Sequence, residues 1–335
     1  MKHVNVALFV PDEGCPHRCS FCNQKVISGV SEKLTEYDIE KAVEIATQSK
    51  KYTSEGEIAF FGGSFTAIET QYMVSLLKKA NEYITQGLFR GVRISTRPDC
   101  INEEVLQTLK KYNVKAIELG CQSMNDKVLE MNTRGHSELD VYNAARLIKA
   151  HGFELGVQMM TGLYGDSDET CLDTARKLIE LKPNTARIYP TIVLEQTKLA
   201  ELLSEGKYKA QTTEEAVDLC SKLLLMFDKS NIPVIRLGLH SGGSVVDGYI
   251  AGAYHEAFRE LCESKIYFDK VLQMINDEKI KVKKLEITVG AKFVSQLIGQ
   301  KKSNLIKLQN LGFECQIIQN PDLKKYEINV RGITK

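Results

Sequence analysis

Several features are scarce or absent in this sequence of 335 residues, and each absence excludes a class of protein. Tryptophan is absent, so 12 Phe and 13 Tyr supply the aromatic side chains. No apolar run approaches the ~18 residues that a membrane-spanning helix requires. The 44 Lys and Arg nearly balance the 43 Asp and Glu, so the net charge of +1 excludes a uniformly basic nucleic-acid binder but allows a local basic patch. We therefore expect a globular protein of the cytoplasm with no membrane partner.

Cysteine is present, but in a pattern that excludes a disulfide scaffold. The chain has nine Cys, an odd number, and it is long for a fold held together by disulfides. Six of them are scattered singly, and we interpret these as small buried hydrophobic residues. The other three, Cys15, Cys19 and Cys22, lie within eight positions and need an explanation of their own.

Strand and helix patterns alternate along most of the chain. Short apolar runs at residues 4–10, 57–61, 92–96, 116–119, 153–160, 185–189 and 233–236 predict strands. Segments with helical spacing of apolar residues separate them, which is the order of a parallel α/β sheet. Six or so such units predict a full or partial (β/α) barrel, whose chemistry lies at the carboxyl ends of its strands.

The chain changes character after residue 240. Residues 241–254 are rich in Gly and small residues, which predicts a loop. Residues 276–335 hold 12 Lys and Arg against 6 Asp and Glu, a net charge of +6, so residues 1–275 carry −5 of the total of +1. We therefore expect a core barrel over 1–240, an extension closing the barrel over 241–275, and a small basic module over 276–335.

The three clustered cysteines have the spacing Cys-x-x-x-Cys-x-x-Cys, on a loop that directly follows the first strand. Thiolates are soft ligands that suit iron–sulfur iron, and three of them can bind three irons of a 4Fe–4S cube. The fourth iron then stays open for a substrate or cofactor such as S-adenosylmethionine. Two alternatives remain, namely a zinc site that adds His17 and a set of inert cysteines.

Polar and small residues follow the next strands. Two glycines, which let a ligand approach the backbone closely, end the second strand. No Lys-Ser or Lys-Thr follows them, so this is not a phosphate-binding loop. Each of the later residues also has an ordinary interpretation as a turn, a cap, a surface group or part of the core. The candidates for a cofactor site are Phe21, Gly62, Gly63, Ser64, Ser95, Gln122, Ser123, Arg134 and Met160.

The cysteine loop, including the aromatic Phe21 before Cys22, resembles the signature of radical S-adenosylmethionine enzymes. The resemblance implies that Cys15, Cys19 and Cys22 ligate a 4Fe–4S cluster. It also implies reductive cleavage of S-adenosylmethionine to a 5′-deoxyadenosyl radical that abstracts a hydrogen. The Gly62-Gly63 stretch would then bind the amino group of the cofactor's methionine, and a reductant such as a ferredoxin or flavodoxin would supply electrons.

Residues 1–240 together resemble the radical domain of the Elongator catalytic subunit and its bacterial relatives, through Gly-Gly-Ser-Phe, Thr-Arg-Pro-Asp and Asn-Thr-Arg-Gly-His. This implies a tRNA or other RNA substrate. Oxygen-independent coproporphyrinogen dehydrogenase is a more distant relative, so a small metabolite is the alternative substrate. A metal-bound RNA-binding protein without enzymatic activity is the third hypothesis. The first two Cys are closer together than in the Elongator subunit, and no acetyl-coenzyme-A loop pattern follows Gly238, so acetyl transfer is not expected.

The basic module has the predicted order β-α-turn-α-β-β, which resembles a KH domain. In that family a Gly-x-x-Gly turn between the helices clamps a single-stranded backbone. The turn here runs from Gly299 to Lys302, with Lys302 in place of the second glycine. The resemblance implies that Gly299, Lys301 and Lys302 contact RNA phosphates, whereas the alternative is a basic surface that only aids solubility.

Overall fold

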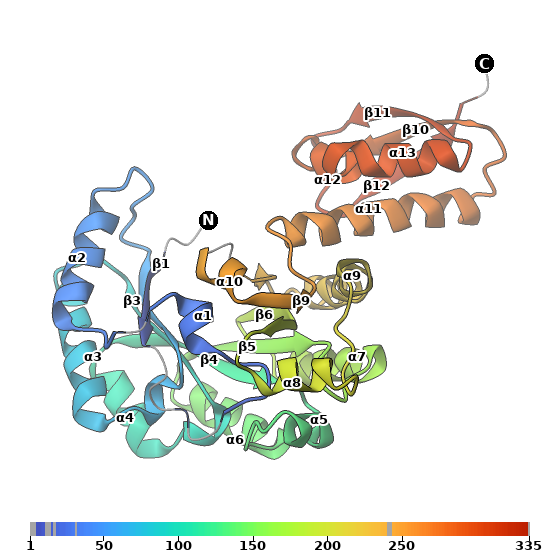
Figure 1. The fold of residues 1–335 in the computed structure, drawn as a ribbon. Coiled ribbons are helices and arrows are strands. Elements are labelled where there is room, and N and C mark those ends of the chain that lie inside the picture. The colour runs from blue at the N-terminus through green and yellow to red at the C-terminus, as the bar shows by residue number, and fades with distance from the viewer. Residues whose placement is uncertain (1–4, 11–14, 16–17, 31, 240–242, 334–335) are drawn as a thin grey trace. The chain divides into compact units, whose positions relative to one another are not determined.

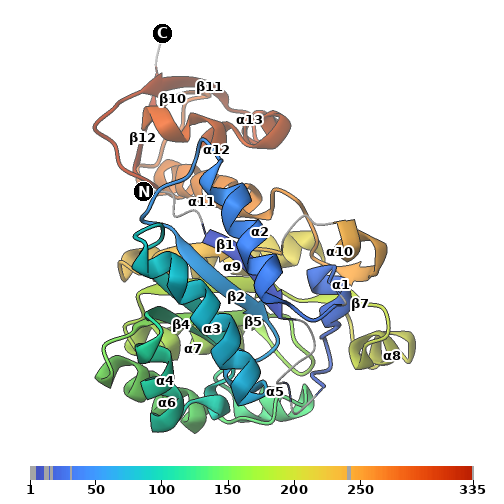
Figure 2. The same cartoon turned by 90° about the vertical axis from the view of Figure 1, so that its left-hand side faces the viewer.

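The computed structural model describes residues 5–10, 15, 18–30, 32–239 and 243–333. These form two compact units, residues 1–211 with 226–254, and residues 212–225 with 255–335. Figures 1 and 2 show the elements of each unit. The boundaries predicted at residues 240 and 275 stay predictions.

The first unit is built on seven parallel strands in the order β1-β2-β3-β4-β5-β6-β8. Since β1 and β8 are the two edges, the described sheet is open, and the predicted barrel is present in its partial form (Figure 1). The strands are β1 (Asn5–Val10), β2 (Glu57–Gly62), β3 (Gly91–Thr96), β4 (Val114–Gln122), β5 (Glu154–Thr161), β6 (Thr185–Pro190) and β8 (Val234–Leu237).

Helices cover the outer face of this sheet (Figure 2). Three of them begin with capping boxes that satisfy their first backbone N–H groups, formed at Thr35, Ser137 and Ser167. The helices of this layer are α2 (Glu36–Thr47), α3 (Thr70–Thr85), α4 (Glu103–Lys111), α5 (Asp126–Met131), α6 (Glu138–Ala150) and α7 (Asp168–Glu180). The strand residues on this face are fully buried and apolar, among them Ile58, Phe60, Ile94, Ile117, Leu119, Leu155 and Ile188.

Alternate strand residues point to the inner face, which is polar. They include Glu57, Arg93, Glu118, Gln158 and Arg187. Because side chains alternate between the two faces of a strand, one face packs against helices and the other is left for chemistry. The chain therefore has an apolar outside layer and a polar concave face.

Shorter elements follow the carboxyl ends of the strands. They are α1 (Gln24–Ser28), β7 (Ile192–Leu194), α8 (Lys198–Ser204), α10 (Gly243–Asp247) and β9 (Tyr249–Gly252). The predicted loop over 241–254 was wrong for residues 243–252, where β9 pairs antiparallel with β7. Gly252 has φ +107°, and a Cβ there would lie 2.8 Å from Thr191 O. The glycines of this segment predicted a loop, but Gly252 instead allows the two strands to approach closely.

The second unit contains the basic module and a long helix, α11 (Phe258–Asp277). This helix was not predicted from the sequence. The strands of the unit are β10 (Lys284–Val289), β11 (Glu314–Gln319) and β12 (Ile328–Gly332), and its short helices are α12 (Val294–Ile298) and α13 (Ser303–Asn310). Most of α9 (Thr213–Lys229), up to Leu225, also belongs to this unit. Asn304 Nδ2 donates to Ser264 O at 2.9 Å and to Leu297 O at 3.0 Å, and so joins α13 to α11 and α12.

In the described part of the chain, no helix combines the length and the apolar character that a membrane span needs.

Candidate active site at the carboxyl ends of the strands

Hydrogen bonds hold the described part of the cysteine loop in place. The Ser20 hydroxyl donates to Asn132 Oδ1 at 2.6 Å, and its backbone N–H donates to Asn132 O at 3.1 Å. The backbone N–H of Leu199 donates to Ser20 O at 2.8 Å. The N–H of Cys22 donates to Cys19 O at 3.1 Å, which forms a tight turn between two of the thiols. Residues beyond the loop thus decide where its cysteines lie.

Apolar packing anchors the same loop. Cys19 and Phe21 are buried in one cluster with Leu163 and Leu199, and the candidates Cys22 and Met160 pack against it. The predicted site residues Phe21 and Met160 therefore lie together. Their neighbours are aliphatic and aromatic, so this side of the loop is apolar.

Two guanidinium groups face the thiols. Arg134 Nη1 donates to Cys19 Sγ at 3.1 Å, and its Nη2 donates to Gly120 O at 2.7 Å. Arg97 interacts electrostatically with Cys19 and is held by Asp99 through two bonds of 3.0 and 2.9 Å. Positive charge beside a sulfur stabilises its thiolate form, which is the form that binds iron. Arg97 belongs to the Thr-Arg-Pro-Asp motif but is not among the predicted site residues, because only the fold directs it at the cysteine loop.

The third thiol lies in a different environment. Burial, followed by the nearby Cys19, raises the pKa of Cys22 to about 12, and a bond of 3.3 Å from Gln24 Nε2 opposes this. Without a metal this thiol stays protonated at neutral pH. Cys22 would bind an iron of a cluster as the thiolate, so it would give up this proton when it holds the cluster.

The residues present fit a cubane cluster. In the described part of the chain, no three His, Cys, Asp or Glu side chains converge on one point where a single ion would bind. A 4Fe–4S cube does not need such convergence, because each thiolate binds its own iron. His17, the additional ligand of the alternative zinc site, lies outside the described residues. Three buried atoms, Arg97 Nη1, Arg134 Nε and Gln122 Oε1, have no hydrogen-bond partner among the described residues, and a bound ligand would satisfy them.

The Gly62-Gly63 pair lies beside the strand that leads into the cysteine loop. Gly62 has φ +116°, and a Cβ there would lie 2.5 Å from Val10 O. The N–H of Gly63 donates to the same Val10 oxygen at 3.1 Å. Only a residue without a side chain permits this approach. The Ser64 hydroxyl is buried, hydrogen-bonded to Thr96 Oγ1 at 2.8 Å, and accepts from the N–H of Arg97 at 3.3 Å, so these groups hold it within the fold.

Three other candidates lie in separate surroundings. Ser95 Oγ accepts from Gln158 Nε2 at 2.8 Å on the inner face. Gln122 ends β4 with φ +66°, a conformation that most residues avoid. Ser123 is buried and accepts from the N–H of Asn125 at 3.2 Å, so its hydroxyl is engaged within the fold. Of these, Gln122 alone presents a buried atom without a partner to the site.

A polar cavity of about 360 Å³ lies next to the end of β5. Its lining includes Gly162, Asp166 and Lys207, and the Tyr208 hydroxyl donates to Gly162 O at 2.6 Å. Burial raises the pKa of Asp166. This cavity is part of the same carboxyl edge as the cysteine loop.

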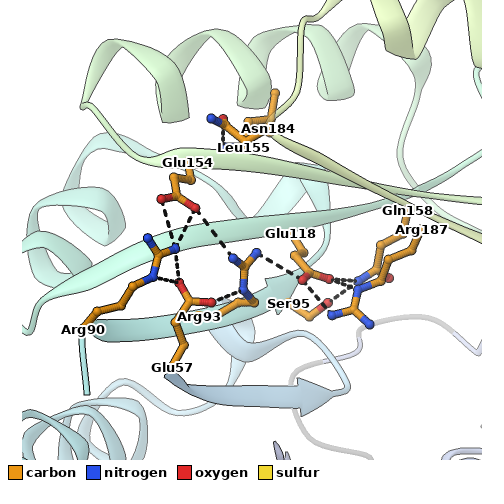
Figure 3. A network of polar contacts seen from close by, with 10 residues as sticks. All are labelled: Glu57, Arg90, Arg93, Ser95, Glu118, Glu154, Leu155, Gln158, Asn184 and Arg187. Atoms are coloured by element: carbon orange, nitrogen blue, oxygen red, sulfur yellow. Dashed lines mark hydrogen bonds and ion pairs between the residues drawn. The ribbon is translucent and has the colours of Figure 1, made fainter. Parts of the chain in front are cut away.

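An ion-pair network crosses the inner face of the sheet below this edge (Figure 3). Glu118, whose side chain is 1% exposed, pairs with Arg187 at 2.6 Å and with Arg93 at 3.3 Å. Arg93 also pairs with Glu57 at 2.6 Å, and Glu57 pairs with Arg90 at 2.6 Å. With Glu154 of β5, which pairs with Arg90 at 3.0 Å, the network links the five neighbouring strands β2 to β6. The sequence patterns did not connect these charges.

A parallel half-barrel that carries three thiols on the loop after its first strand defines the class of enzymes that cleave S-adenosylmethionine at an iron–sulfur cluster. The family description "Radical SAM superfamily" matches residues 10–178, and "Radical_SAM C-terminal domain" matches residues 183–267. This chain belongs to the radical SAM superfamily, whose members are enzymes that use a 4Fe–4S cluster and S-adenosylmethionine. The family predicted from the cysteine loop is confirmed.

Relatives place the chain near one branch. An uncharacterized protein of Methanocaldococcus jannaschii is 29% identical over 220 residues, covering 63% of this chain and 68% of its own. The tRNA uridine(34) acetyltransferase of the same organism is 28% identical over 256 alignment positions that cover 64% of this chain and 47% of that protein. The human Elongator complex protein 3 is 26% identical over 190 residues, 51% of this chain and 35% of the relative. The chain thus spans 47% of the length of this acetyltransferase and 35% of the length of the human protein.

Among solved structures, an archaeal Elp3 from Methanocaldococcus infernus with an N-terminal deletion superposes with a TM-score of 0.62. It is 20% identical, and the match covers 87% of this chain and 66% of that chain. This likeness establishes the shared fold.

Proposed function

We propose that this chain modifies an RNA, with tRNA as its substrate, by radical S-adenosylmethionine chemistry. The observation that carries the proposal is the 28% identity to an enzyme named for its action on tRNA uridine 34. Acetyl transfer is not part of the proposal, because this chain covers 47% of that enzyme's length.

In this proposal Cys15, Cys19 and Cys22 hold the cluster. When bound, the cluster and S-adenosylmethionine supply a 5′-deoxyadenosyl radical that removes a hydrogen atom from the substrate. Arg134 donates to the Cys19 sulfur and fixes the loop against Gly120. The Gly62-Gly63 backbone receives the methionine amino group of the cofactor, and a ferredoxin or flavodoxin is the proposed electron donor.

The second unit would supply RNA affinity through its turn. Lys301 has φ +52° and Lys302 has φ +63°, so both lysines adopt a left-handed conformation that costs about 1–2 kcal/mol per residue. A Cβ at Gly299 would lie 2.5 Å from Ser303 Oγ and 2.8 Å from Ser264 Oγ, so this position requires glycine. Backbone strain that persists at two exposed lysines is typical of a binding site, and phosphates are the proposed ligands.

Two experiments test the proposal. The first is mass spectrometry of tRNA nucleosides from a deletion strain, in which we expect one modified nucleoside to disappear. A wild-type nucleoside profile would contradict the RNA substrate and favour a small metabolite. The second is 5′-deoxyadenosine formation under dithionite by the anaerobically reconstituted protein. Cys19→Ala should abolish it, whereas the matched control Cys315→Ala, on β11, should not.

A gel shift with tRNA tests the turn. Lys301→Ala/Lys302→Ala should weaken tRNA binding. It should also reduce the slope of log Kd against log salt concentration by roughly 2, because two phosphate contacts are lost. The control Lys281→Ala/Lys283→Ala removes the same charge from two exposed lysines of the same module. Equal effects of the two double variants would mean that the module acts only through its net charge.

A further inference from the structure

Side chains near the carboxyl ends of several strands line the inner face beside the ion-pair network. We call five of them, Phe9, Phe61, Met160, Tyr189 and Arg236, the layer. None of them is fully buried, although each lies within a sheet. In parallel sheets this is the level at which substrates meet the protein.

The charge of this layer is positive. Arg236 is its only formally charged member, and the Arg236 Nε donates to Gly238 O at 2.8 Å. The charged or ionisable groups that act on it are Tyr189 and Arg187. In the part of the chain that the structure describes, no carboxylate is paired with Arg236. An arginine held against another arginine is costly unless an anion joins them.

The neighbouring ion-pair network, whose member Arg187 pairs in register with Arg236, cannot supply that anion. The network of Figure 3 contains three carboxylates and three guanidiniums, those of Glu57, Glu118 and Glu154 and of Arg90, Arg93 and Arg187. Its formal charges cancel, and Glu118 already binds Arg187 through both of its oxygens. Among the residues that the structure describes, Arg236 is therefore one positive charge in excess on the inner face.

The opposite side of the layer is aromatic. The rings of Phe9 and Phe61 are 6.4 Å apart and tilted by 48°, and the Arg187 guanidinium lies 5.0 Å from the centre of the Phe61 ring. Both rings are partly exposed. Aromatic rings accept nucleic-acid bases by stacking, without regard to base identity.

We propose that this layer binds one unstacked nucleotide of the RNA substrate, with its phosphate on Arg236 and its base against Phe61 and Phe9. An enzyme that acts on a base within an RNA must first take that base out of its stack, and it needs a pocket with a cation and an aromatic surface to hold it. This inference rests on the proposed function and names the part of the substrate that enters the half-barrel.

The test uses the full-length, anaerobically reconstituted protein with saturating S-adenosylmethionine. Ligand-observed NMR titrations measure the affinity for uridine 5′-monophosphate and for uridine. The wild type should bind the nucleotide at least ~10-fold more tightly than the nucleoside, since a charge-assisted hydrogen bond to the phosphate is worth that much. Arg236→Gln should remove this preference, and the control Arg146→Gln, on the exposed side of α6, should keep it.

Further variants keep the result decisive. Arg236→Lys retains the charge and should retain part of the preference, and Phe61→Leu should weaken both ligands equally. Equal affinity of the wild type for nucleotide and nucleoside would overturn the proposal, as would an unchanged preference in Arg236→Gln. Weaker binding of S-adenosylmethionine by Arg236→Gln would also overturn it, because Arg236 would then serve the cofactor.

These outcomes separate the nucleotide site from the proposed function. If tRNA nucleosides are unchanged in the deletion strain but Arg236→Gln loses the phosphate preference, the site stands and the tRNA substrate fails. If the nucleoside profile changes but the wild type shows no phosphate preference, the tRNA substrate stands and the site fails.

Discussion

Glu118→Gln is the substitution with the largest expected effect on stability. The Glu118 carboxylate accepts from Arg187 Nη2 at 2.9 Å, from Gln158 Nε2 at 2.8 Å and from Arg93 Nη1 at 3.3 Å. Its side chain is 1% exposed. The amide keeps the shape but removes the negative charge, so the network of three carboxylates and three guanidiniums gains a net buried charge of +1.

Removing one partner of a buried ion pair typically costs about 3–5 kcal/mol. The outer end of this network is partly exposed, with Arg90 at 30% and Glu154 at 35%, so water screens some of the excess charge. We therefore expect the lower end of that range, about 3 kcal/mol, which lowers Tm by roughly 4–6 °C. Thermal unfolding followed by circular dichroism measures it.

Two further variants test the charge argument. Glu118→Gln/Arg187→Gln restores neutrality, so it should be less destabilised than the sum of the two single variants. Glu130→Gln changes the same charge at an exposed position of α5 and should change stability by less than ~0.5 kcal/mol. A loss of under ~1 kcal/mol in Glu118→Gln, the size of an exposed ion pair, would refute the reasoning.

Three other predictions follow from the site and the module. Lys302→Gly relieves a left-handed lysine and should stabilise the protein by about 0.5–1 kcal/mol in chemical denaturation; a loss of stability would mean that the strain is not in the backbone. Arg134→Gln removes a cation from the Cys19 sulfur and should lower the reduction potential of the cluster in an EPR redox titration; an unchanged potential would contradict the contact. Burial, followed by the charge of Arg134, lowers the pKa of His136 to about 4. The free energy of unfolding should therefore fall by about 2–3 kcal/mol as pH drops from ~6.5 towards 4, because the unfolded chain takes up the proton first. His136→Gln should lose that part of the pH dependence.

The sequence predicted most of the half-barrel, because strands buried against helices are nearly continuous apolar runs. The run at residues 57–61 became β2, and the run at residues 185–189 became β6. The sequence did not predict α11, whose buried face includes Glu263, Ser264 and Tyr267 and so departs from a simple apolar stripe. Polar residues that are buried by tertiary contacts carry no periodic signal.

The candidate site divides in the same way. The spacing of Cys15, Cys19 and Cys22 predicted the cofactor, because three thiolates within eight residues on one loop suit few other ligands. Arg134 was predicted as a residue of the cofactor site, and in the structure its guanidinium donates to Cys19 and Gly120. Its role as a cofactor ligand stays a prediction.

The sequence alone determined the chemistry of this protein, since the cysteine spacing and the strand order are properties of consecutive residues. Tertiary structure decided which charges meet on the inner face. Glu118 and Arg187 are 69 positions apart, and Arg187 and Arg236 are 49 apart, yet they lie on neighbouring or nearby strands. A parallel sheet brings such residues together only after each crossover helix has folded back, so their pairing and the unpaired charge of Arg236 become visible only in the folded chain.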